Sequence, residues 1–260
     1  MQKHILLLHG NGGASTRFIP FLKSLKESDL ALSAHIPQLP GFEGRPLPKS
    51  KDYWAVFLEA IESTVTQQEG QWIFYGHGIG GSVLLELAAR DYTFPSGRQI
   101  KPDQVILHSC IGASLQYRFF PKLMKPLFLR QFIKKMVHSK PLQPFWEKKL
   151  FLFPEQIDTE IKNQFFADYK NCQAFEVFFD LITPAWYKEV QAKTQDQAFE
   201  FLWGDKERVV ASKYLTYWKK DFPNAHFDTV KGWDHFPMLD SPEDFFEKIT
   251  TLIFQTQSMR

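Results

Sequence analysis

The chain has 260 residues, of which 44% are hydrophobic and 23% charged, with a formal net charge of +2. These ordinary globular proportions exclude a disordered or fibrous chain, and the balanced charge argues against a nucleic-acid-binding protein. Two cysteines, Cys110 and Cys172, are too few for a disulfide scaffold or a four-cysteine zinc site. The sequence shows neither a transmembrane run nor a signal-peptide core, so we expect a cytoplasmic protein.

Short apolar runs alternate with amphipathic segments over residues 1–112, starting with Ile5–Leu8 as a buried strand. The strands that we expect next are Leu32–Ile36, Trp72–Tyr75 and Gln104–His108. Apolar residues at helical spacing predict helices within 18–25, 54–68 and 83–89.

The same alternation returns over residues 194–260. It predicts strands at Phe199–Trp203 and His226–Val230, and helices at Ala211–Trp218 and Phe245–Phe254. Strands that alternate with helices indicate an α/β fold, with a mostly parallel sheet covered by helices on both faces.

Between residues 113 and 193 the strand pattern disappears, and phenylalanine-rich, proline-punctuated segments replace it. We expect a helical cap inserted after the fourth core strand, so that residues 1–112 and 194–260 form one core. From Arg118 to Lys149 this insertion carries nine basic residues and a single acidic one, Glu147. Such a charge run is typical of a solvated helical face, or of a surface that meets an anionic substrate or anionic lipid headgroups.

The glycine turn at residues 76–81 is the most informative local motif. The segment Gly76-His77-Gly78-Ile79-Gly80 follows a predicted strand and opens a predicted helix. That is the layout of the nucleophile elbow, G-x-S-x-G, in which a strained turn lifts the central side chain above the sheet. Here the central residue is Gly78, so the nucleophile is missing.

Three further segments occur in the order that accompanies such an elbow. They are His9-Gly10-Asn11-Gly12-Gly13 after the first strand, Phe201-Leu-Trp-Gly204-Asp205 at a later strand end, and Gly232-Trp-Asp-His235-Phe-Pro237. Together with the elbow they resemble the oxyanion loop, the acid strand and the histidine loop of the α/β-hydrolase-fold family. The resemblance covers residues 1–112 and 194–260 and treats the insertion only as a cap.

The resemblance implies roles for five positions. His235 would be the general base, Asp205 the acid that orients it, and Gly78 the nucleophile position. The backbone N–H groups of Asn11 and Ile79 would form the oxyanion hole. Because glycine has no oxygen to attack an acyl carbonyl, the covalent route is closed, and ester turnover would fall by about a million-fold.

Three explanations of Gly78 remain open. In the first, the parent is an ester or thioester hydrolase and glycine was introduced into it. In the second, the chain is a natural relative that only binds ligand. In the third, His235 and Asp205 act on water or a substrate proton without a covalent intermediate. A structural alternative is that His235 and Asp205 merely hydrogen-bond between two loops.

The cap composition suggests a small-molecule substrate with an apolar acyl or aromatic group, as in the thioesters that some relatives cleave. Phe145 and Trp146 are candidate substrate contacts, and the basic residues are candidate partners for a carboxylate or phosphate. No metal or organic cofactor is implied, because the histidines show no ligand spacing. The sequence gives no basis for assigning an oligomeric state.

The sequence also offers two alternative sites, a dinucleotide site and a substitute nucleophile. A dinucleotide site at Gly76–Gly81 would need an acidic residue about 20 positions later at the end of the next strand, and Asp91 is too near. The segment His108-Ser109-Cys110, at the end of a predicted strand, is a candidate source of a substitute nucleophile, although a cysteine in that place is more often a small buried residue.

Overall fold

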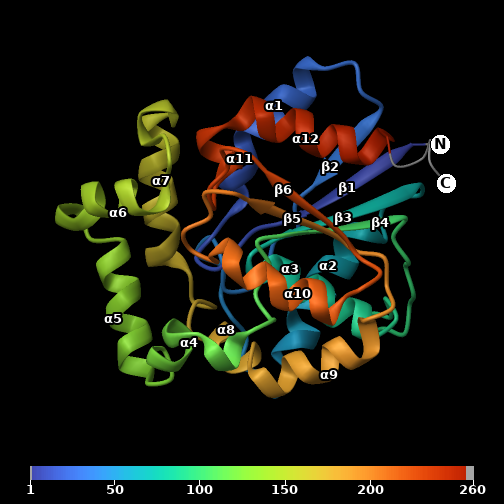
Figure 1. Cartoon of the computed structure of the whole chain (residues 1–260), viewed down its shortest axis with the longest axis horizontal. Helices are drawn as coiled ribbons and strands as arrows, with labels where there is room; N and C mark the ends of the chain where they lie inside the picture. Colours follow the sequence, from blue (N-terminus) through green and yellow to red (C-terminus); the bar gives the residue numbers. More distant parts are fainter. Residues whose placement is uncertain (1, 256–260) are drawn as a thin grey trace.

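A computed structural model of the chain describes residues 2–255 and contains one six-stranded sheet (Figure 1). The strands lie in the order β2-β1-β3-β4-β5-β6, and every neighbouring pair is parallel. Their bounds are β1 (Lys3–Leu8), β2 (Leu32–His35), β3 (Gln71–His77), β4 (Gln104–His108), β5 (Glu200–Gly204) and β6 (His226–Val230). The predicted parallel sheet is confirmed, with strand ends displaced by no more than two residues.

Helices cover both faces of the sheet (Figure 1). One face carries α1 (Ile19–Glu27) and α12 (Pro242–Gln255), which meet through Phe21 and Phe245 with ring centroids 5.8 Å apart. The other carries α2 (Tyr53–Val65), α3 (Ile79–Ala89), α9 (Pro184–Thr194) and α10 (Leu215–Asp221). Because β1 is buried along its whole length, its continuous apolar run Ile5–Leu8 suits a central parallel strand.

The insertion between β4 and β5 is helical, as expected. It contains α4 (Phe119–Leu123), α5 (Leu127–Val137), α6 (Gln143–Leu150), α7 (Thr159–Asn171) and α8 (Phe178–Leu181). We call α4 to α8 the cap; α4 to α7 stand beside the sheet at the left of Figure 1.

Helix α9 lies within the range 113–193 that the sequence analysis assigned to the cap, yet it packs with the core helices. The Trp186 indole donates a hydrogen bond of 2.7 Å to Glu86 of α3 and stacks on Trp54 of α2 at 5.3 Å. Phe178 of α8 likewise stacks on Phe57 of α2 at 4.7 Å, so the part of the insertion that stands apart from the sheet is α4 to α7.

Within residues 2–255, no helix has both the length and the apolar character needed to cross a membrane.

Candidate active site

The turn at Gly78 has the backbone geometry of a nucleophile elbow. Strand β3 ends at His77, Gly78 adopts φ +55° and ψ −116°, and α3 starts at Ile79. A Cβ on Gly76 would lie 2.6 Å from the Gly80 backbone, and one on Gly80 would lie 2.6 Å from the Leu8 carbonyl oxygen. The two flanking glycines are thus required by close backbone contacts, which hold strand and helix against each other.

Gly78 differs from these flanking glycines in its surroundings. A Cβ there would meet only the Gly10 Cα, at 3.5 Å, which is ordinary van der Waals contact. Its N–H donates to the His108 carbonyl oxygen at 2.9 Å, and the residue lines a cavity. Packing therefore leaves room for a side chain at position 78.

The base expected from sequence, His235, is held by Glu207. Its Nδ1–H donates to Oε2 of Glu207 at 2.9 Å, and the Ser109 hydroxyl donates to the same oxygen at 2.6 Å. The other carboxylate oxygen accepts the N–H groups of Val209 and Val210 at 2.7 and 2.8 Å. Both oxygens of this fully buried carboxylate are consequently fixed by hydrogen bonds.

The environment of Glu207 keeps it ionised. Burial by itself raises the pKa of Glu207, but the His235 imidazole and the hydrogen bonds from His235, Ser109 and Val210 outweigh it and lower this pKa to about 2. An ionised acceptor at Nδ1 fixes the tautomer of His235 and leaves Nε2 as the basic atom. The pair is thereby arranged for general-base chemistry.

The expectation that Asp205 orients His235 is wrong. The Asp205 carboxylate accepts the Gly232 N–H at 2.7 Å and lies 3.4 Å from Lys206 on the surface. Asp205 and Glu207 both follow β5. The chain turns after Gly204, with the Glu207 N–H 3.4 Å from the Gly204 carbonyl oxygen, and this turn brings the Glu207 side chain to the His235 loop. The sequence signal for Glu207 was only its place in the same loop, two residues after the expected acid.

An ion pair ties the loops of Glu207 and His235 together. Asp234 is fully buried and accepts the Arg208 backbone N–H at 2.9 Å as well as hydrogen bonds from its guanidinium. The Arg208 guanidinium also donates to the Lys148 carbonyl of α6 at 3.1 Å. Because these residues adjoin Glu207 and His235 in sequence, the pair stabilises the spacing of acid and base and connects it to the cap.

Two more histidines surround the base but are not themselves suited to act as one. The His77 Nε2–H donates to the His235 carbonyl at 2.8 Å, with the rings 4.5 Å apart. Burial, and then the charges of His235 and His108, hold the pKa of His77 well below its usual range. Burial also lowers the pKa of His108 to about 3. Both rings therefore stay neutral and act as positioning groups.

Asn11 and Ile79, the expected oxyanion donors, line the cavity together with Gly78 and His235. Ile79 is the first residue of α3, where backbone N–H groups lack partners within the helix. The Asn11 amide donates to the Phe175 carbonyl of the cap at 3.0 Å and its oxygen accepts the Gly12 N–H at 3.0 Å. The structure brings both residues to the elbow, and their role stays a prediction.

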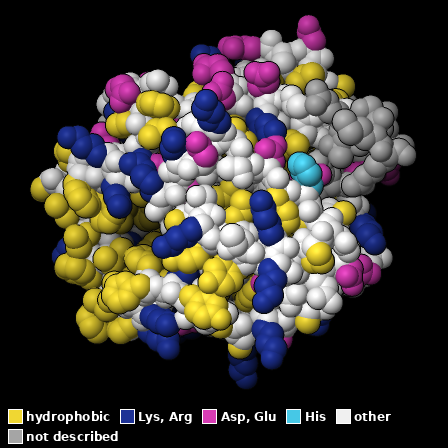
Figure 2. Space-filling model, in the orientation of Figure 1, with side chains coloured by type: hydrophobic (Ala, Val, Ile, Leu, Met, Phe, Trp, Pro, Cys, Tyr) yellow, Lys and Arg dark blue, Asp and Glu magenta, His cyan; other side chains and the backbone are white. Residues whose placement is uncertain are grey.

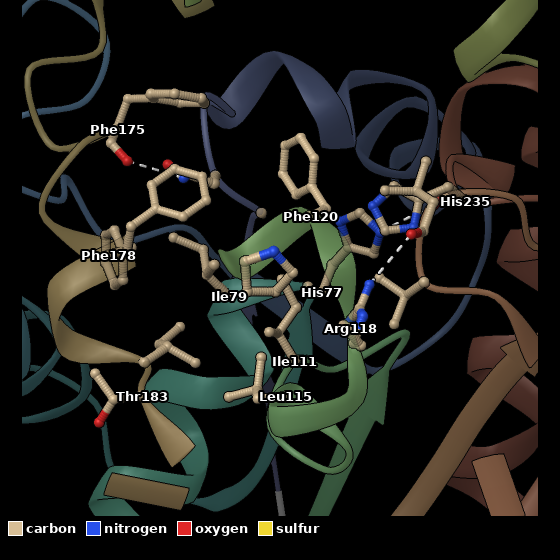
Figure 3. A pocket seen from close by; sticks show the side chains of 18 of the residues that line it. His77, Ile79, Ile111, Leu115, Arg118, Phe120, Phe175, Phe178, Thr183 and His235 are labelled. Carbon is tan, nitrogen blue, oxygen red and sulfur yellow. Dashed lines mark hydrogen bonds between the residues drawn. The ribbon is translucent and has the colours of Figure 1, made fainter. Parts of the chain in front are cut away.

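The cavity beside the elbow has a volume of about 410 Å³ and is bounded mainly by apolar side chains of core and cap. Figure 3 shows His77 and His235 at one end of it, with Ile79, Phe178 and Thr183 extending toward the other. The candidate contacts Phe145 and Trp146 do not line it. Phe145 is 60% exposed, and the Trp146 indole donates to the Met136 carbonyl. The lining phenylalanines of the cap are instead Phe120, Phe175, Phe178 and Phe179.

A buried cation, Arg17, also lines this cavity and was missed by sequence reasoning. Its Nη2 donates to the Gly12 carbonyl at 3.2 Å, whereas Nε and Nη1 have no hydrogen-bond partner among the described residues. Its guanidinium lies 3.4 Å from the Phe165 ring centre and 4.9 Å from that of Phe236. Burial lowers the pKa of Arg17, which nearby Tyr169 and Asp168 raise. Nε and Nη1 are themselves shielded from solvent, so Arg17 affects the cavity through its positive charge.

Cys110 is not suited to replace the missing nucleophile. The side chain is fully buried and does not line the cavity, and burial raises the pKa of its thiol far above the usual range. Within residues 2–255, no group of three His, Cys, Asp or Glu side chains is placed to hold a metal ion.

Solved structures with this fold come from several kinds of hydrolase. A lipase candidate of Acinetobacter baumannii shares 18% identity, with a TM-score of 0.73 over 100% of this chain and 86% of that one. A carboxylesterase of Nitrososphaera gargenis shares 16%, with a TM-score of 0.69 over 100% and 92%. An epoxide hydrolase of Vigna radiata shares 15%, with a TM-score of 0.68 over 98% and 92%. At these identities the likeness establishes the fold alone.

No curated protein matches the sequence significantly. The family model described as "Alpha/beta hydrolase family" matches residues 5–248, which include the elbow, the Glu207 loop and the His235 loop. The chain belongs to the alpha/beta hydrolase family.

Proposed function

We propose that this chain has the scaffold of an ester or thioester hydrolase for a small substrate with an apolar acyl or aromatic group, with its covalent chemistry disabled at Gly78. The observation that carries the proposal is the complete set of hydrogen bonds at Glu207 and His235 next to an elbow that has room for a side chain. If the loops of Glu207 and His235 had a purely structural role, a buried carboxylate hydrogen-bonded to a histidine of the cavity wall would not be required.

With serine at position 78, each residue has a definite task. The hydroxyl oxygen attacks the acyl carbonyl while Nε2 of His235 takes its proton, and ionised Glu207 stabilises the resulting imidazolium. The N–H groups of Asn11 and Ile79 donate to the oxyanion. His235 then protonates the leaving alcohol or thiol. In the second half, His235 takes a proton from water, which attacks the acyl-enzyme, and then returns the proton to the serine oxygen as the acid leaves. With glycine at position 78, no acyl-enzyme bond can form.

The cavity supports the proposed substrate class. Its apolar walls suit an acyl chain or aromatic ring, because small-molecule sites are mostly apolar with a few well-placed polar groups. Arg17 places a positive charge beside these walls, which favours a substrate that carries a carboxylate or carbonyl oxygen.

A second candidate is hydrolysis without a covalent intermediate. His235, oriented by Glu207, lines the same cavity as Gly78, so a water molecule held in this cavity is a candidate for activation by the base. Pure ligand binding in the same cavity is the third candidate.

The test is a paired assay of the unaltered chain, Gly78→Ser and Gly78→Ala with aryl esters, aryl thioesters and a fluorophosphonate probe. We expect Gly78→Ser to react with the probe and to exceed Gly78→Ala in ester turnover by about a thousand-fold or more. Alanine is the matched control, because it adds the same Cβ without the oxygen.

Other outcomes separate the three candidates. Turnover by the unaltered chain that disappears in His235→Ala would favour water activation. If no variant reacts and ligand binding survives His235→Ala, the proposal is wrong and the cavity serves binding.

A further inference from the structure

Helix α5 of the cap is packed with Arg130 facing inward. Arg130 is only 5% exposed and donates to both carboxylate oxygens of Asp180 at 2.6 Å. It also donates to the carbonyls of Met124, Lys125 and Glu176 at 2.6 to 3.0 Å. On the other side of the helix, Phe128 and Phe132 are 68% and 56% exposed.

These phenylalanines belong to a larger apolar surface, which we call the cap patch. It consists of Phe119, Phe120, Leu127, Phe128, Phe132 and Phe145, each between 47% and 75% exposed. Figure 2 shows hydrophobic side chains gathered over the cap at the left of the molecule, with Lys and Arg among them. Monomeric soluble proteins rarely expose contiguous patches of this kind, which usually mark an interaction site.

Exposed lysines accompany the cap patch. They are Lys122, Lys125, Lys135, Lys140, Lys148 and Lys149. Over residues 2–255, none of them has a carboxylate partner within 4.0 Å. Lys135 and Lys149 lie about one helical turn after Phe132 and Phe145, so apolar and cationic side chains share the same surface.

An anionic bilayer surface fits this combination of side chains. Interfacial helices bury aromatic and aliphatic side chains at the headgroup boundary while lysines contact anionic lipids. A second copy of this chain fits poorly, because a two-fold interface would bring the same lysines together from both sides. Between Arg118 and Lys149 the sequence has one acidic residue, Glu147. This part of the cap therefore adds little negative charge that would repel anionic lipids.

We propose that the cap patch docks onto an anionic lipid bilayer, with its phenylalanines inserted at the headgroup boundary and its lysines against the phosphate and carboxylate groups. Phe120, Lys122 and Lys125 also line the active-site cavity, so that cavity borders the docking face. Lipid-borne or membrane-dissolved ligands would then reach the cavity from the bilayer side. The proposal stands on surface residues and is independent of the role of Gly78.

The experiment is cosedimentation of the full chain with phosphatidylcholine vesicles, with and without phosphatidylserine. We expect binding only with phosphatidylserine at low salt, and weaker binding as salt rises. Lys148→Gln with Lys149→Gln should weaken it roughly 25-fold, or about fivefold per lysine. Phe128→Ser with Phe132→Ser should weaken it tenfold or more.

The matched control is Lys49→Gln with Lys51→Gln, exposed residues outside the cap that change the net charge equally. Circular dichroism establishes that every variant folds. If the unaltered chain fails to bind anionic vesicles at low salt, or the control weakens binding as much as the cap pair, the proposal is wrong. A lipid-free dimer by light scattering that Phe128→Ser with Phe132→Ser dissociates would also overturn it, in favour of an interface between copies.

Discussion

The loop after β5 and the cap each bury a charged side chain that makes several hydrogen bonds, but with different structural results. Glu207 is buried so that its contacts fix the base toward the cavity. Arg130 is buried so that α5 can present its phenylalanines outward. In the core the buried charge orients a side chain of the cavity wall, whereas in the cap it lies behind a helix face whose phenylalanines are exposed.

The largest expected effect concerns which carboxylate supports His235. In the Gly78→Ser background, Glu207→Ala should lower kcat by about ten-thousand-fold, because the histidine loses the partner that fixes its tautomer. Asp205→Ala should leave kcat within a few-fold, because the Asp205 carboxylate contacts Gly232 and Lys206 rather than His235. Ester kinetics of the two variants measure this difference.

Equal losses in the two variants would contradict the assignment of Glu207. A thermal-denaturation control separates a kinetic loss from unfolding, since Glu207 also holds the N–H groups of Val209 and Val210.

A second prediction compares the phenylalanines of the two regions. Phe21 is fully buried against Phe245 and Phe246, so Phe21→Ala should lower the free energy of unfolding by about 3–5 kcal/mol. Phe128→Ala should change it by no more than about 0.5 kcal/mol, because its ring faces solvent. Urea denaturation of both variants without lipid gives the comparison. A large loss in Phe128→Ala would mean that its ring packs inside the protein.

The smallest expected effect is an acid dependence of stability. The folded-state pKa of Glu207 is about 2 against an ordinary value of 4.5, so its stabilising contribution is complete above pH 4.5 and is lost as the pH falls toward 2. The stability difference between the unaltered chain and Glu207→Gln should therefore shrink over this interval. Urea midpoints at several pH values measure it, and a constant difference would refute the low pKa.

Local sequence patterns were sufficient to predict the sheet. Apolar runs such as Ile5–Leu8 and Gln104–His108 are continuous because a parallel strand is buried on both faces. The elbow was equally predictable, because Gly76 and Gly80 are required by backbone contacts that no other residue tolerates. His235 follows from its loop and its position in the chain.

The acid residue and the cavity-lining side chains were not predicted correctly, because contacts between distant segments of the chain determine both. Asp205 and Glu207 stand in the same loop, and only the approach of the His235 loop selects the second. Phe145 and Phe178 are both cap phenylalanines, and only tertiary packing puts Phe178 in the cavity and Phe145 at the surface. Arg17 carried no sequence signal, since its burial depends on Phe165 and Phe236 from distant segments.

The turn at Gly78 also has a consequence for the balance between stability and activity. Its φ of +55° and ψ of −116° lie outside the regions open to residues with a Cβ, where a non-glycine residue typically costs about 1–3 kcal/mol. A serine in this place would be held under backbone strain, which glycine avoids. Gly78→Ser would therefore add the proposed nucleophile at a cost in folding free energy.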